Sequence, residues 1–288
     1  MQEPIVHENQ VIQDWQFPVQ VLSRQTNRES QGCEFHWHKP VEFYYVAEGG
    51  VHLCCNGEDA WLYEGDIGIV NCREPHKSLE FQNHSRHYCI QADVSLLQSG
   101  PWDICGERYV APIENAGYIF PHFVRQNREI GLQLQRIVTE YEARRIGYEL
   151  EIKAALASIF VSLLRGEELR LRSPANLSSY HRENDYVTWL LQTIADRYDT
   201  ELTLPALAKG LGISEAHMCR VFKRHTGVSI LTYMHQLRCY RAAGLLRGGY
   251  TVTATAYEVG YNDANYFSRI FRRIMGEAPS RFGRGGRD

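Results

Sequence analysis

Two copies of one helical pattern, at residues 203–226 and 252–275, constrain the fold of this chain most. Each copy predicts a short helix, a tight turn and a second helix with one apolar face. In the first copy, Thr203 and Ser214 are placed to cap the two helices, and Gly212 is placed to end the first of them. We therefore expect the C-terminal third to be an all-helical unit built from two such pairs.

The second helix of each copy also carries a polar and cationic outer face at helical spacing. By spacing alone, this face consists of Ala216, Cys219, Arg220 and Lys223 in the first copy, and of Asn265, Ser268, Arg269 and Arg272 in the second. Arginine side chains are well shaped to pair with guanine in the major groove. A single helix pair of this kind is often only a structural corner, but two matching pairs favour DNA binding.

Charge and composition agree with this interpretation. The net charge is −3, yet residues 181–288 contain 15 Lys+Arg against 10 Asp+Glu, and the remainder contains 16 against 24. A basic module on an acidic body is typical of a nucleic-acid-facing unit joined to another domain. A length of 288 residues and a hydrophobic content of 44% predict an ordinary soluble protein of two domains.

The chain shows no membrane or secretion signal by sequence. It lacks the roughly 18-residue apolar run that a membrane helix needs, and its N-terminus has no basic flank followed by an apolar segment. The eight cysteines form no CxxC pair, so we expect free thiols in a reducing compartment. The expected localisation is cytoplasmic.

Residues 11–110 show short β-type segments separated by turn residues, which predicts a β-sandwich or barrel. Within them lie His36, His38 and Glu42, whose equal parity would place their side chains on one face of a continuous strand, and His76 follows later. Three imidazoles and a carboxylate are ligands that suit Zn, Fe, Mn or Ni. Pro40 interrupts this strand, so buried hydrogen-bonding groups are the alternative interpretation.

Aromatic residues cluster around the same segment, and they either pack the sheet core or line a pocket for a small ligand such as a sugar. The pocket hypothesis combines them with the polar cluster. Its residues are Trp37, His36, His38, Glu42, Tyr44, Trp61 and His76.

This segment resembles the cupin superfamily. The spacings His36-x-His38, Glu42 four residues later and Gly49 seven residues further match the first cupin motif. Gly65-Asp66, Pro75 and His76 match the second motif in part, without its final Asn. The resemblance implies a jelly-roll barrel that binds an effector, with a divalent metal as an additional hypothesis at His36, His38, Glu42 and His76; no cofactor is required.

Residues 123–164 change to a helical period and predict two amphipathic helices. Their apolar faces either pack on the barrel or meet their copies in a second protomer, since two-fold dimers are the commonest assembly. The segment 166–180 contains Pro and Ser without an apolar period, which indicates an interdomain linker.

Residues 181–282 closely resemble the AraC/XylS family of transcription regulators. The matching residues are Leu207-Ala208, Gly212, Ser214, Arg220, Phe222-Lys223, Gly227, Arg238, Ala242, Leu245-Leu246, Ala256, Gly260-Tyr261, Phe267-Ser268-Arg269, Phe271, Gly276 and Pro279. Thr255 departs from the family, which usually has an apolar residue there. The resemblance implies two helix-turn-helix units on a connecting helix, reading successive major grooves of promoter DNA.

Roles transferred by position complete the DNA-binding set. Ala216, Cys219 and Arg220 would face bases in the first unit, and Ala264, Asn265, Ser268 and Arg269 in the second; His217 belongs to the same set. Lys223, Arg224, Arg272 and Arg273 would contact phosphates, which give affinity without sequence information.

The sequence thus predicts an α+β protein with a cupin-like effector-binding and dimerisation domain at 1–165, a linker at 166–180 and a DNA-binding domain at 181–288. The expected function is a ligand-responsive, non-enzymatic transcription regulator that controls genes of carbohydrate or other small-molecule metabolism. Its expected partners are promoter DNA, a small effector such as a saccharide, a second copy of the chain and, for an activator, RNA polymerase. The alternative is a metal-dependent cupin enzyme with a DNA-binding tail.

Overall fold

The computed structural model describes residues 12, 14, 16–26, 30–31, 35–98, 100 and 103–282. The chain divides into two compact units that meet between Asn184 and Asp185. Among the helices of these residues, none has both the length and the apolar character needed to cross a membrane.

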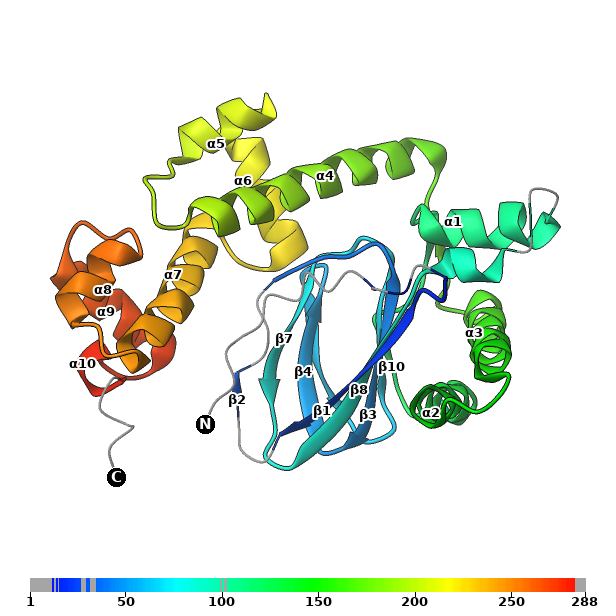
Figure 1. Ribbon diagram of the computed structural model, residues 1–288. Helices are drawn as coiled ribbons and strands as arrows, with labels where there is room; N and C mark the ends of the chain where they lie inside the picture. Colours follow the sequence, from blue (N-terminus) through cyan, green and yellow to red (C-terminus); the bar gives the residue numbers. More distant parts are fainter. Residues whose placement is uncertain are drawn as a thin grey trace. The chain divides into compact units, whose positions relative to one another are not determined.

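The first unit contains two antiparallel sheets, whose strands are drawn in Figure 1. The strands are β1 (Val19–Thr26), β2 (Ser30–Gln31), β3 (Val41–Glu48), β4 (Gly50–Cys55), β5 (Glu58–Tyr63), β6 (Ile67–Val70), β7 (His76–Phe81), β8 (Ser85–Ala92), β9 (Tyr118–Ile119), β10 (Phe123–Val124) and β11 (Arg170–Leu171). One sheet has the order β1-β8-β3-β6-β10 and the other β2-β7-β4-β5, while β9 and β11 form a separate pair. The predicted strand-rich unit is confirmed, but the described strands form separate sheets and not one closed barrel.

Strand β3 shows how the residues build this arrangement, because its side chains alternate between two apolar environments. Phe43 and Tyr45 pack with the helices that follow the sheets, whereas Tyr44 and Val46 pack with residues of β4 and β5. Both faces of β3 are therefore covered, which explains its long apolar run.

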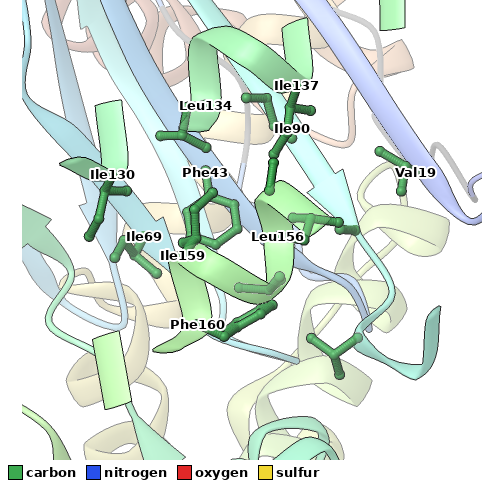
Figure 2. Close-up of a cluster of buried hydrophobic side chains, with 14 of the residues drawn as sticks. Val19, Phe43, Ile69, Ile90, Ile130, Leu134, Ile137, Leu156, Ile159 and Phe160 are labelled. Carbon is green, nitrogen blue, oxygen red and sulfur yellow. The ribbon is translucent and has the colours of Figure 1, made fainter. Parts of the chain in front are cut away.

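The helices of the first unit are η1 (Val94–Leu97), η2 (Gly106–Val110), α1 (Ala111–Glu114), α2 (Arg128–Ala143) and α3 (Tyr148–Arg165). Figure 2 shows α2 and α3 side chains, among them Leu134 and Phe160, gathered around Phe43 of β3. The apolar faces that the sequence predicts for 123–164 are thus buried within this chain. They do not remain free for a second protomer.

Helix α4 (Pro174–Arg197) overlaps the segment 166–180. The prediction of a linker is wrong for residues 174–180, because these residues form the first part of α4. The last of them, Tyr180, is buried. The positions Tyr180, Asn184, Val187, Leu191 and Ile194 are buried at spacings of three and four residues, so a helical stripe starts inside the expected linker. The stripe is hard to recognise in the sequence because its first members are a tyrosine that follows two serines and an asparagine between two acidic residues.

The second unit is all-helical. After the second half of α4 it contains α5 (Leu204–Leu211), α6 (Glu215–Thr226), α7 (Ile230–Arg247), α8 (Val252–Glu258), α9 (Ala264–Met275) and α10 (Pro279–Phe282). The helices predicted at 203–226 and 252–275 are confirmed as α5–α6 and α8–α9. Thr203 and Ser214 cap α5 and α6 as expected, through side-chain oxygens that accept from Ala206 and His217 backbone N–H groups.

The described cysteines are free thiols. Cys105 is exposed and Cys219 is partly exposed, while Cys54, Cys55, Cys72, Cys89 and Cys239 are buried. Burial raises the pKa of Cys72 to about 12 and that of Cys239 to about 12. These buried thiols therefore act as small apolar groups.

Candidate nucleic-acid interface and sheet-interior cluster

Helix α6 presents the first cationic face. Met218, Val221 and Phe222 are buried against the rest of the unit, and Arg220 and Lys223 are exposed on the other side. The α6 helix ends at Gly227 in a left-handed conformation with φ of 75°. The sequence places inner and outer faces correctly here because both follow directly from helical spacing.

Helix α9 presents the second face. The Asp263 carboxylate accepts a hydrogen bond of 2.6 Å from the Tyr266 backbone N–H and so caps the helix. Phe267, Ile270 and Phe271 are buried as predicted. Ile274, which the sequence also places inward, is only partly buried.

The expected DNA-facing residues differ in solvent exposure. Those that are exposed are Ala216, Arg220, Lys223, Arg224, Asn265, Arg269, Arg272 and Arg273. Those that are partly buried are His217, Cys219, Ala264 and Ser268. The Ser268 hydroxyl donates to the Ala264 carbonyl at 2.8 Å, so it is already engaged within its own helix.

Tyr266 is a surface residue that the sequence-based set omits. Its side chain is 40% exposed beside Asn265, and the Arg269 guanidinium lies 5.8 Å from the centre of its ring. The Tyr266 hydroxyl also lies 3.3 Å from His235 Nε2 on α7. An aromatic residue on the outer face of α9 was the available signal.

Arg238 of α7 ties the second helix pair to the end of α4. Its guanidinium is largely buried and donates to the Tyr198 carbonyl at 2.7 Å and the Thr200 carbonyl at 2.9 Å. It also lies over the Tyr261 ring, with 5.2 Å between the guanidinium carbon and the ring centre. The turn Gly260-Tyr261 is therefore held from outside its own helices.

Thr255 on α8 is fully buried, and its hydroxyl has no hydrogen-bond partner within the described residues. An unsatisfied buried hydroxyl opposes folding by roughly 1–3 kcal/mol. We therefore expect Thr255→Val, which keeps the shape of the side chain, to raise the free energy of unfolding of the second unit by about 1 kcal/mol. Urea denaturation followed by circular dichroism measures this change; a Thr255→Val protein less stable than the wild type would contradict the expectation.

The first unit contains a second group of polar residues, inside the sheets. His36 forms a backbone bridge with His76, through N–H to carbonyl bonds of 3.0 and 2.9 Å. Glu42 Oε2 lies 2.9 Å from His76 Nε2 and 3.3 Å from His38 Nε2. The structure thus brings together the four residues that the sequence singles out, and one ligand atom from each lies within 4.8 Å of the others.

Burial and contacts within the group together set its charge state. Glu42 and His76 are 0% exposed. Burial by itself opposes ionisation of Glu42, but His38 and His76 hold the pKa of this carboxyl well below its ordinary value. Burial, reinforced by His36, lowers the pKa of His76 to about 4. An ionised carboxylate therefore faces a neutral imidazole.

Of the other expected pocket residues, Tyr44 lies on the same face of β3 as Glu42, whereas Trp61 lies on the outer side of β5. Tyr44 faces the sheet interior, where its ring stacks 6.2 Å from that of His87. Trp61 stacks 5.0 Å from His52 on β4, on the opposite side of β5 from the interior residue Leu62. The inclusion of Trp61 in the pocket is wrong, because strand parity turns it outward. Trp37 is partly buried.

A further buried network joins Glu74 to distant parts of the unit. The Glu74 carboxylate accepts from Asn71 Nδ2 at 3.1 Å and lies 2.9 Å from His122 Nε2. It also accepts from the Tyr180 hydroxyl at 3.4 Å, and Arg172 Nη2 lies 3.9 Å away. Burial opposes the charge of His122, but Glu74 and then Glu58 outweigh it and raise the pKa of His122 to about 8.

Known proteins match both the helix-turn-helix region and most of the chain's length. A profile of the helix-turn-helix domain matches residues 207–285. The HTH-type transcriptional activator RhaS of Salmonella paratyphi B (strain ATCC BAA-1250 / SPB7) is 27% identical over 253 residues, which cover 85% of each chain. These findings support the resemblance of the chain to AraC/XylS transcription regulators.

Two solved structures are similar to this regulator. A probable AraC family transcriptional regulator from Rhodopseudomonas palustris CGA009 is 28% identical and covers 36% of this chain and 99% of its own, with a TM-score of 0.34. ToxT from Vibrio cholerae O395 is 14% identical and covers 92% of this chain and 97% of its own, with a TM-score of 0.47. In the regulator described here, α6 and α9 occupy the second-helix positions of the two helix-turn-helix units.

Proposed function

We propose that this regulator reads promoter DNA through α6 and α9 in response to a small ligand bound by its first unit. The observation that carries the proposal is the pair of exposed arginines, Arg220 and Arg269, on two capped helices whose opposite faces are buried. Each helix is thereby held rigidly while its cationic face stays available to a groove. The relatives are transcription activators by name, which supports a non-enzymatic role.

Arg220 and Arg269 are proposed to read bases, because each lies in the second turn of its helix, nearer the capped start than the cationic residues that follow it. The N-terminal residues of a recognition helix are those that reach base edges. Lys223, Arg224 and Arg272 lie nearer the C-terminal ends of the two helices and are proposed to contact phosphates. Tyr266, with Arg269 over its ring, adds an apolar surface suited to a thymine methyl group.

Binding to a selected operator tests these roles. Arg220→Ala and Arg269→Ala are each expected to weaken specific binding by about 1–3 kcal/mol and to relax preference at one or two base pairs. Lys223→Ala is the control on the same helix as Arg220, and it is expected to weaken all sequences alike and to reduce the salt slope by about one. The measurement is fluorescence anisotropy on operator and scrambled DNA at several salt concentrations. Unchanged operator affinity in both arginine variants would exclude this placement of the reading helices.

The first unit is proposed to be a cupin-like sensor domain that binds a small effector between its sheets. Support comes from the polar and aromatic side chains that face the interior, where Gln91 Nε2 donates to Glu42 Oε1 at 3.2 Å and Tyr44 stacks on His87. A mixture of aromatic rings and hydrogen-bonding groups suits a saccharide. Calorimetry with a panel of monosaccharides tests this; heats that persist unchanged in Gln91→Ala would place binding elsewhere.

We also propose that the regulator acts as a homodimer and, as an activator, with RNA polymerase. Exposed apolar residues on α2, on α3 and in the turn between them support the dimer, namely Leu132, Leu150 and Ile146. Sedimentation at micromolar protein distinguishes a dimer from a single species of 33.2 kDa. Transcription in vitro from the selected operator distinguishes activation from repression.

A further inference from the structure

Tyr266 of α9 is joined to the interior of the second unit through His235 of α7. His235 Nε2 lies 3.3 Å from the Tyr266 hydroxyl, and His235 Nδ1 lies 2.8 Å from the hydroxyl of Tyr261. Tyr261 is 3% exposed and has the Arg238 guanidinium over its ring, whereas Tyr266 is 40% exposed. His235 therefore connects a fixed, buried tyrosine to a tyrosine on the surface.

A neutral imidazole ring can satisfy both tyrosines at once. Burial, together with the nearby Arg238 and Arg273, lowers the pKa of His235, so the ring is uncharged at neutral pH. One ring nitrogen then carries a hydrogen and the other a lone pair, and a tyrosine hydroxyl can either donate or accept. The Tyr266 hydroxyl therefore keeps its hydrogen-bond partner whichever ring nitrogen carries the hydrogen.

Ring packing restricts Tyr266 further. The His235 ring is stacked on that of Tyr261, with centres 5.6 Å apart and 14° between the planes. It meets the Tyr266 ring edge to face, with centres 5.9 Å apart and 67° between the planes. The Arg269 guanidinium carbon lies 5.8 Å from the centre of the Tyr266 ring. The four side chains thus form a row from the buried turn to the arginine that is proposed to read bases.

This row prepares the outer face of α9 for DNA. Ordering a free surface side chain against a partner costs conformational entropy, and the contacts of Tyr266 with His235 meet that cost before DNA arrives. Tyr266 and Arg269 are three residues apart and lie on one face of the helix, so they face neighbouring base pairs. Arginine pairs with guanine, and an apolar ring suits the methyl group of thymine.

We infer that His235 is a positioning residue that holds Tyr266 beside Arg269, so that these two side chains together select a thymine next to a guanine. The inference rests on the proposed reading of DNA by α9. It adds to that proposal a residue of α7 and the kind of base step that α9 selects. His235 acts through Tyr266 and not through a contact of its own with DNA.

Deoxyuridine, which lacks the methyl group of thymine, is the probe. An operator selected from random DNA is prepared with deoxyuridine in place of each thymine in turn, and fluorescence anisotropy measures the affinity of the full chain for each DNA. In the wild type we expect a thymine, adjacent to the guanine that Arg269→Ala ceases to select, at which deoxyuridine weakens binding about fourfold, the effect of one buried methyl group. Tyr266→Ala is expected to abolish this penalty.

His235→Phe and Tyr266→Phe remove the same hydrogen bond from its two ends and keep both rings. Each is expected to reduce the deoxyuridine penalty to about twofold or less, and the double variant is expected to behave like either single variant. His235→Gln keeps a donor and an acceptor and is expected to retain a larger penalty than His235→Phe. Tyr257→Phe, which removes the hydroxyl of an exposed tyrosine on α8, is the control and is expected to keep the wild-type penalty.

The outcomes separate this inference from the proposed function. A wild type without any preferred DNA sequence would overturn both. A wild type in which Arg269→Ala loses its guanine, but no neighbouring thymine shows a methyl preference, would overturn the inference alone. A His235→Phe protein with a lower melting temperature and the full deoxyuridine penalty would also overturn it, because His235 would then be only structural. If His235→Phe does not fold, Tyr266→Phe decides, since it removes the same hydrogen bond at the surface.

Discussion

Gly260→Ala is expected to unfold the second helix-turn-helix unit at temperatures where the wild type is stable. Gly260 has φ of 85°, a left-handed conformation that disfavours alanine by about 1–2 kcal/mol. A Cβ atom there would also lie 2.8 Å from the backbone carbon and oxygen of Asp199 and 2.9 Å from Arg238 Nη2. Because backbone atoms cannot yield cheaply, we expect a total loss of about 3–4 kcal/mol in the free energy of unfolding.

Gly212→Ala is the matched control, because it occupies the equivalent turn of the first unit. Gly212 also has a left-handed φ, of 66°, but nothing lies within 4 Å of an added Cβ atom. Only the conformational cost of about 1–2 kcal/mol applies there. Thermal denaturation of the two variants measures the difference. Equal losses would mean that the contact with Asp199 is not what restricts Gly260.

Glu74→Ala is expected to lower the free energy of unfolding of the first unit by about 3–5 kcal/mol, since removal of one member of a buried ion pair leaves the other uncompensated. The variant deprives His122, Asn71 and Tyr180 of their shared acceptor. Glu58→Ala removes the other carboxylate beside His122, 3.1 Å from Nδ1, but this side chain is 63% exposed. That control is expected to cost about 1 kcal/mol or less.

The pair formed by Glu74 and His122 makes the free energy of unfolding of the first unit depend on pH. The pKa of His122 is raised from 6.5 to about 8, so its contribution is complete below pH 6.5 and is lost as the pH rises through 8. The pKa of Glu74 is lowered from 4.5, so its contribution is complete above 4.5 and is lost at lower pH. Urea denaturation should therefore show greatest stability of the first unit between these limits. A Glu74→Ala protein with the same alkaline decline as the wild type would contradict this assignment.

Helices α6 and α9, which are proposed to read DNA, could be predicted from sequence because everything that defines them is local. Caps such as Ser214, inner residues such as Phe222 and outer residues such as Arg220 all follow from spacing along one helix. The start of α4 could not be predicted in this way. Its buried face begins with Tyr180, whose hydroxyl bonds to Glu74, a residue that is distant in sequence.

The sheet interior was predictable only in part. The continuous strand expected through His36, His38 and Glu42 is wrong, because β3 begins at Val41, after Pro40. His38 still lies 3.3 Å from Glu42, and the bridge between His36 and His76 completes the group. Trp61 was misplaced because composition suggests an aromatic pocket, whereas the direction of the side chain depends on the strand pairing with β4. Pairing between distant segments is what a single sequence does not specify.

The exposure of the described cysteines allows chemical labelling to report DNA binding without any added probe. Cys219 is partly exposed on the face of α6 that carries Arg220, and Cys105 is exposed in the first unit, while the other described cysteines are buried. An alkylating reagent should therefore label these two sites before the rest of the described set. If α6 enters the groove, DNA protects Cys219 and leaves Cys105 as an internal reference, so mass spectrometry can follow occupancy on the unmodified chain.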